Sequence, residues 1–133
     1  MRGLHGLSIG FAAGAVGGLI CSLVIWLSGE LGLTTHYGVR IHPVLEPAWL
    51  YPRVVWGGIW GMTFILPYLD RFVVVKGLVF SLFPTAFQLF VVFPVFLNQG
   101  IMGTRLGEMT PFFVVGFNAV WGLVAGYWLR IAR

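Results

Sequence analysis

Residues 6–22 read GLSIGFAAGAVGGLICS, and this stretch decides the fold. Small residues recur at every fourth position along it: Gly6, Gly10, Gly14, Gly18 and Ser22. In water such a helix would be weak, because each interior glycine costs about 0.5–1 kcal/mol relative to alanine. In a bilayer the backbone has no water to bond, so an apolar segment is held helical. A face without side chains then lets a second helix approach closely, which predicts a membrane-spanning helix with a packing seam.

The composition places the whole chain in a membrane. Of its 133 residues, 59% are hydrophobic and only 9% are charged, whereas soluble domains carry about 25% charged residues. We therefore expect an all-α fold: a single domain, residues 1–133, that forms an integral membrane bundle of four transmembrane helices. The expected spans are about 4–28, 53–69, 72–97 and 111–130, close to the roughly 20 residues that a bilayer requires.

Glycines at helical spacing recur in the second and fourth expected spans. Because glycine faces allow close helix contact, we expect the bundle to be packed through them. The predicted helix-packing residues are Gly6, Gly10, Gly14, Gly18, Gly57, Gly61, Gly122 and Gly126.

The third expected span has two different faces and an internal proline. Pro84 cannot donate a hydrogen bond to the carbonyl of Phe80, so we expect a kink there. The phenylalanines expected to contact lipid are Phe80, Phe83, Phe87 and Phe90. The polar side chains expected to face the bundle interior are Ser81, Thr85 and Gln88.

Gln88 and Asn118 are the strongly polar side chains nearest to the middle of the expected spans. An unpaired amide in hydrocarbon costs several kcal/mol, so both are predicted to be buried polar residues. Their depths, counted from the ends of the third and fourth spans, differ by less than one helical turn. We expect them to hydrogen-bond directly, to each other's backbone, or through one water. We expect every Asp, Glu, Lys and Arg to lie at a span end or in a loop.

The charge distribution predicts the orientation. With four spans both termini share a side, and that side carries five of the eight Lys and Arg residues: Arg2, Arg71, Lys76, Arg130 and Arg133. The opposite side carries three, Arg40, Arg53 and Arg105. Since positively charged residues concentrate on the cytoplasmic side, we expect both termini in the cytoplasm and a multi-pass protein of the bacterial cytoplasmic (inner) membrane.

The segment from Lys76 to Tyr127 resembles a family of small, four-span bacterial inner-membrane proteins of unknown function, the YagU-like proteins. The matching positions are Pro94, Gly103, Arg105, Leu106, Gly107 and Gly122. The chain departs from the family pattern at Asn118 and Trp121, where the family has His and Tyr. The resemblance implies an architecture and no established activity.

The histidines are the candidate ligands for a metal or a cofactor. His36 and His42 share a loop with Glu30 and Glu46, but a spacing of six is no standard ligand pattern, so we expect a solvated or partner-facing loop and no metal. His5 could ligate a haem or a pigment, yet an interfacial polar role is the simpler interpretation of its position near a span end. We therefore expect no cofactor.

No Ser/His/Asp set, Cys/His pair, phosphate loop or carboxylate pair stands at membrane-interface positions to support catalysis, so we expect no enzyme. Two function classes stay open. The first is a structural or accessory subunit that packs against a larger membrane complex, such as a respiratory or photosynthetic one. The alternative is a small homo-oligomeric permease or channel for an ion or a small solute. No charged residue is expected at mid-membrane depth, and this favours the structural or accessory subunit. Expected partners are membrane lipids and other membrane protein subunits or further copies of this chain, and not nucleic acid.

Overall fold

The computed structural model describes residues 3–132, and every regular element within that range is helical. The elements are α1 (Gly3–Glu30), α2 (Leu33–His36), α3 (Pro47–Gly61), η1 (Met62–Ile65), α4 (Val73–Phe80), α5 (Leu82–Phe87), η2 (Gln88–Phe96), η3 (Ile101–Leu106) and α6 (Thr110–Ala132). η1 and η3 are 3₁₀-helices and η2 is π-helical. The expected all-α class is therefore confirmed for this range.

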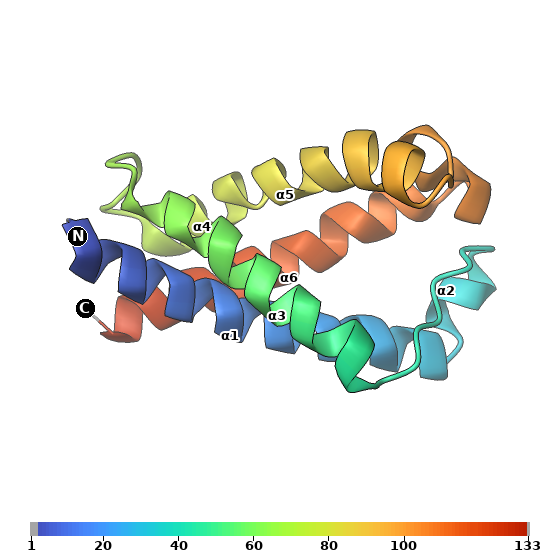
Figure 1. The fold of residues 1–133 in the computed structure, drawn as a ribbon, viewed down its shortest axis with the longest axis horizontal. Helices are drawn as coiled ribbons and strands as arrows, with labels where there is room; N and C mark the ends of the chain where they lie inside the picture. Colours follow the sequence, from blue (N-terminus) through green and yellow to red (C-terminus); the bar gives the residue numbers. More distant parts are fainter. Residues whose placement is uncertain (1–2, 133) are drawn as a thin grey trace.

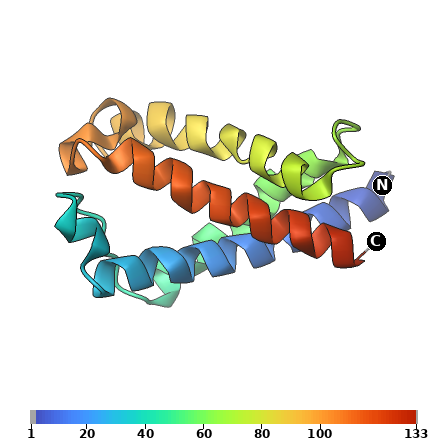
Figure 2. The same cartoon turned by 180° about the vertical axis from the view of Figure 1, so that it is seen from behind.

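The helices form two hairpins that share a central contact. In the first hairpin α3 and η1 return along α1, and in the second α6 returns along α4, α5 and η2 (Figure 1). α1 also packs against α6. We call the end where α1 begins and α6 finishes the terminal end, and the end with α2 and η3 the loop end (Figure 1). Seen from behind, α1 and α6 cross near the terminal end and diverge toward the loop end (Figure 2).

Glycines bring the backbones of α1 and α3 into direct contact. A Cβ added at Gly10 would lie 2.6 Å from the carbonyl oxygen of Gly61, and one added at Gly57 would lie 2.7 Å from the carbonyl oxygen of Gly14. Real Cβ atoms essentially never come closer than 3.0 Å to such atoms. Gly18 meets the α3 backbone in the same way. The small-residue seam of α1 thus packs against the glycines of the chain's own α3.

Glycines also bring the helix backbones together in the second hairpin and between the two hairpins. Gly77 of α4 and Gly122 of α6 face each other so closely that a Cβ on either would collide with the carbonyl oxygen of the other. A Cβ at Gly126 would lie 2.9 Å from a carbonyl oxygen of α4. Between the hairpins, a Cβ at Gly17 would lie 2.8 Å from the carbonyl oxygen of Trp121. All three helix contacts therefore depend on missing side chains.

Three helical segments are long and apolar enough to cross a membrane: Gly3–Glu30, Val73–Phe96 and Thr110–Ala132. Their bounds agree within a few residues with three of the four spans expected from the sequence. Gly6 is buried in the first of them. α3 has 15 residues, fewer than a single membrane crossing requires. The expectation of four spans is therefore not confirmed by the described helices.

The bounds 53–69 expected for the second span were wrong at both ends. Its helix begins six residues earlier, at Pro47, because proline is well suited to the first helical position, where its missing N–H leaves no hydrogen bond unmade. The helical conformation finishes at Ile65. Leu66 precedes a proline, which disfavours helical backbone angles, and it is extended, with φ −62° and ψ 134°.

The segment from α4 to η2 departs twice from regular α-helix. The expected interruption is present between α4 and α5, where Pro84 leaves the Phe80 carbonyl without its usual donor. The π-helical η2 was not expected. Pro94 lies inside it and also lacks an N–H, and the N–H of Leu97 bonds to the carbonyl of Val92, five residues back, at 2.9 Å.

The expectation that Phe80 faces lipid was wrong. Its side chain is only 4% exposed, because its ring stacks on Phe64, with the centroids 5.7 Å apart, and Phe64 stacks in turn on Trp121 at 5.6 Å. This aromatic stack fills the interior between η1, α4 and α6. Phe83 and Phe90 are exposed as expected.

The burial of Lys76 was also not expected, and its side chain is only 1% exposed. Its ammonium group donates hydrogen bonds to the carbonyl oxygens of Phe64 and Leu66, at 2.7 and 2.6 Å, and to the carboxylate of Asp70 at 2.5 Å. A buried charge is tolerated when it is paired and hydrogen-bonded in this way. Lys76 therefore holds η1 and the following turn against α4 and is no surface charge.

The glycine contact of the first hairpin gives a direct prediction. Gly14→Leu should destabilise the protein by about 3 kcal/mol or more, because its added atoms collide with backbone and not with a movable side chain. Thermal unfolding in mild detergent measures the loss. The matched control is Gly116→Leu on α6, since a Cβ at Gly116 meets nothing within 4 Å. Equal tolerance of the two variants would contradict glycine packing between α1 and α3.

Candidate functional site

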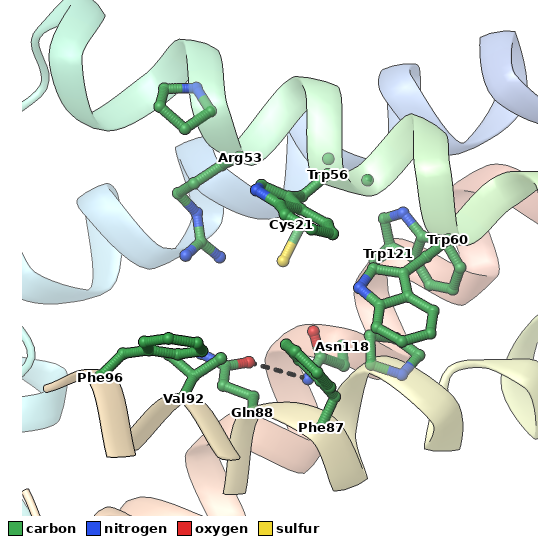
Figure 3. Close-up of a pocket in the computed structure, with 14 residues that line it drawn as sticks. Cys21, Arg53, Trp56, Trp60, Phe87, Gln88, Val92, Phe96, Asn118 and Trp121 are labelled. Carbon is green, nitrogen blue, oxygen red and sulfur yellow. Dashed lines mark hydrogen bonds between the residues drawn. The ribbon is translucent and has the colours of Figure 1, made fainter. Parts of the chain in front are cut away.

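A cavity of about 420 Å³ lies between α3 and the α5–η2 segment (Figure 3). It exists because α3 packs on α1 whereas η2 belongs to the other hairpin, so neither covers the other. Its wall is largely aromatic, formed by Trp56, Trp60, Phe87, Phe96 and Trp121. The polar and sulfur-containing side chains at the cavity are Cys21, Arg53, Gln88 and Asn118 (Figure 3).

Arg53 is the charged group of this cavity. Its side chain extends from α3 into the space above η2 (Figure 3). Its Nε donates a hydrogen bond to the hydroxyl of Ser22 at 3.0 Å, and its guanidinium carbon lies 5.2 Å from the centre of the Trp49 ring. Within residues 3–132 the ion pairs are His42 with Glu30 and Lys76 with Asp70. In this part of the chain Arg53 thus has no carboxylate partner.

The sequence analysis placed Arg53 at the end of a span, and the structure places it inside α3. The reason is the early helix start at Pro47. Its partner Ser22 lies eight residues before the last residue of α1, Glu30, a distance of about 12 Å along the helix axis. Arg53 therefore lies within a helix, and not in a loop or at a helix end. The Glu46-Pro47 pair is the sequence feature that indicates a helix start at residue 47, because proline is common at the first helical position.

The expected contact between the two amides is present. Asn118 Nδ2 donates a hydrogen bond to Gln88 Oε1 at 3.2 Å, across the second hairpin from α6 to η2 (Figure 3). Asn118 is buried and Gln88 is half-buried. The bond uses one donor and one acceptor, so the Gln88 amide nitrogen and the Asn118 carbonyl oxygen can still bond to another molecule.

A second cavity, of about 340 Å³, lies at the loop end beside the first. The side chains that line both cavities are Arg53, Gln88 and Asn118. The second cavity adds Arg40 and His42 from the loop before α3. The polar groups of the site are therefore gathered where the two cavities meet.

The loops of the two hairpins contact each other beside the second cavity. The N–H of Arg40 donates to the carbonyl of Leu106 at 2.8 Å, and its guanidinium donates to the carbonyl of Arg105. Gly107 adopts φ +150° and lies against the Gly38 backbone, where a Cβ would collide. These contacts fix the Arg40 backbone beside the cavity. No pattern in the sequence indicates this pairing of distant loops.

The histidines and acids considered as metal ligands are only partly brought together. His42 Nε2 lies 3.3 Å from Glu30 Oε1, while the His36 ring packs edge-on against Tyr37. His5 is exposed in the first turn of α1, and Glu46 precedes α3 without capping it through its side chain. In the described range no three His, Cys, Asp or Glu side chains are grouped as a metal site would require.

Cys21 lies at the edge of the first cavity and is buried. Its thiol donates to the carbonyl of Phe117 at 3.0 Å. It therefore connects α1 to α6 and extends the packing between the hairpins.

No family model, curated protein or solved structure matches this chain. The resemblance to the YagU-like proteins therefore stays a prediction. The loop-end residues that carry it, Gly103, Arg105 and Leu106, lie in η3.

The amide pair gives a second prediction. Gln88→Leu and Asn118→Leu should each destabilise the protein, because each leaves one amide unpaired in an apolar interior. The double variant should be more stable than the sum of the two losses implies, with a coupling of about 0.6–2 kcal/mol. A double-mutant cycle of unfolding free energies measures this coupling. Losses that add within about 0.3–0.5 kcal/mol would show that the two amides act independently.

Proposed function

We propose that this protein is a non-enzymatic, four-span protein of the bacterial cytoplasmic membrane that binds an anionic amphipathic molecule of the bilayer between its hairpins. The observation that carries the proposal is the position of Arg53, a guanidinium that lines an aromatic cavity and has no carboxylate partner in the described range. Charged residues inside membrane bundles are rare, and they usually mark a functional site. An anionic group on a ligand supplies the missing partner.

The shape of the cavity supports an amphipathic ligand. Its volume of about 420 Å³ lies within the range of ligand pockets, which are mostly apolar with a few polar groups that orient the ligand. The rings of Trp60 and Phe87, 5.6 Å apart, bridge α3 and α5 at one side of the cavity. Trp56 and Phe96 are 53% and 67% exposed, and they form a margin that bilayer lipid can reach. An apolar chain can therefore enter from the membrane.

The length of the second helical pass supports the fourth span. α3 has 15 residues and is followed directly by the four residues of η1. At 1.5 Å per α-helical residue and 2.0 Å per 3₁₀ residue they rise about 30 Å together. This matches the hydrocarbon thickness of a bilayer. The pass also runs along α1, which itself is long enough to cross.

The two functions considered from the sequence gain less support. The glycine faces of α1, α3, α4 and α6 pack the chain's own helices together, so they are not open to a larger complex. A permease or channel would have to conduct between copies, because Phe80, Phe64 and Trp121 are stacked in the interior of a single copy. A cavity that opens toward the bilayer at Trp56 and Phe96 favours ligand binding over either passage or scaffolding.

The orientation gives a third prediction. The start of α1 and the end of α6 share the terminal end, and the excess of Lys and Arg on that side supports a cytoplasmic position. In a Cys21→Ser background, which keeps a donor for the Phe117 carbonyl, His36→Cys should react with an impermeant maleimide on intact cells. Arg71→Cys should react only after permeabilisation. The reverse pattern would contradict cytoplasmic termini. Both positions are exposed.

The proposed binding gives a fourth prediction. Native mass spectrometry of protein extracted in mild detergent should detect a retained anionic lipid. Arg53→Gln should reduce this retention roughly 10- to 100-fold, because hydrogen bonds to charged groups contribute about 1.5–3 kcal/mol. Glutamine can still donate to Ser22, so the fold should persist.

The control for this measurement is Arg71→Gln, which removes an exposed charge near the terminal end and should leave retention unchanged. Unchanged retention in Arg53→Gln, or retention of neutral lipid alone by the unaltered protein, would overturn the proposal. Melting temperatures of both variants check that they are folded.

A further inference from the structure

We infer that the ligand is a lipid whose head carries a phosphate, held with the phosphate between Arg53 and Arg40 and the apolar chain along the aromatic wall. This inference rests on the proposed function and adds the chemistry of the head and its orientation. The observations that carry it are two neighbouring cavities that share Arg53, Gln88 and Asn118, the arginine pair at the second cavity, and the absence of acids among the described lining residues.

The two cavities offer different environments to one molecule. The first is bounded by five aromatic side chains and reaches the exposed margin at Trp56 and Phe96. The second lies at the loop end, next to the loops that carry Arg40 and His42. Because both share Arg53, Gln88 and Asn118, a ligand that spans them places its polar part at this shared wall. Its chain then extends toward the bilayer and its head toward the loops.

The charge of the second cavity exceeds what a simple carboxylate would balance. Arg40 and Arg53 both line it, and no Asp or Glu is among its described lining residues. His42 Nε2 is already within 3.3 Å of the Glu30 carboxylate, so the two guanidinium groups are the charges left to a ligand. Two positive charges without acids beside them favour a strongly anionic group.

The free donors of the two arginines match a phosphate. Arg53 donates its Nε–H to Ser22, and its terminal nitrogens carry further N–H groups that can bond to a ligand. Arg40 uses a terminal nitrogen on the Arg105 carbonyl and keeps further N–H groups. One guanidinium can engage both oxygens of a carboxylate, whereas a phosphate has further oxygens for a second guanidinium. The amides of Gln88 and Asn118 add donors at the same wall.

Arg40 is held beside this cavity by the other hairpin. Its backbone and its guanidinium both donate to carbonyls of η3, at Leu106 and Arg105. The charge is therefore positioned before a ligand arrives, which reduces the entropy lost on binding. Arg53 is likewise held by Ser22 and by the Trp49 ring.

The test is a titration of delipidated, detergent-solubilised protein followed by native mass spectrometry. The probes are dioleoyl phosphatidic acid, dioleoyl phosphatidylglycerol, oleate and inorganic phosphate. Both phospholipids should bind at least tenfold more tightly than oleate or inorganic phosphate. Arg40→Gln should weaken phospholipid binding about tenfold and leave oleate binding unchanged, and Arg40→Lys should weaken it less. The control is Arg71→Gln, which removes an exposed charge near the terminal end, lines neither cavity and should leave phospholipid binding unchanged.

The outcomes separate this inference from the proposal on which it rests. Oleate that binds as tightly as the phospholipids, with Arg40→Gln without effect, would overturn the phosphate assignment and leave the binding of an anionic amphiphile standing. Inorganic phosphate that binds as tightly as the phospholipids would overturn the assignment to a lipid. Binding of all four probes that is insensitive to Arg53→Gln would overturn both.

Discussion

Backbone contact at glycine is the constraint on which the rest of the structure depends. In a bilayer the helices gain little from leaving lipid, so close packing must hold them together. Gly14 against Gly57 and Gly61 closes the first hairpin, and Gly77 against Gly122 closes the second. α3 is thereby bound to α1, whereas α4 is bound to α6. The cavity between α3 and η2 follows from this arrangement.

The polar side chains are concentrated where that cavity lies. A polar group in an apolar interior is costly unless it is bonded, and here Ser22 bonds to Arg53 while Asn118 bonds to Gln88. The remaining charge of Arg53 is compensated by no acid in the described range. In contrast, the buried Lys76 near the terminal end is fully engaged by two carbonyls and a carboxylate. The two cations therefore differ: Lys76 stabilises the fold, whereas Arg53 is the cation that we propose binds a ligand.

The sequence predicts the features that depend on regular helix geometry. The glycine spacing predicts the seam of α1, and counting along two spans predicts the contact of Gln88 with Asn118. Face assignments fail where the helix is irregular, as at Phe80, because they assume continuous rotation through the break between α4 and α5.

Contacts between segments that lie far apart in the chain could not be predicted from the sequence. The burial of Lys76 depends on carbonyls that η1 and the following turn leave available. The position of Arg40 depends on a loop that lies more than sixty residues further along the chain. Neither relation leaves a periodic pattern in the sequence. The inward position of Arg53 could have been predicted from Pro47 alone, had the helix start been placed there.

A structure of the protein purified with its native lipids tests the central claim most directly. The account predicts elongated density in the cavity between α3 and η2, with its polar end about 3 Å from the terminal nitrogens of Arg53. It also predicts that the density continues along Trp56 and Phe96 toward the bilayer. A cavity closed by direct contact of α3 with η2, or Arg53 paired with a carboxylate of this chain, would contradict it.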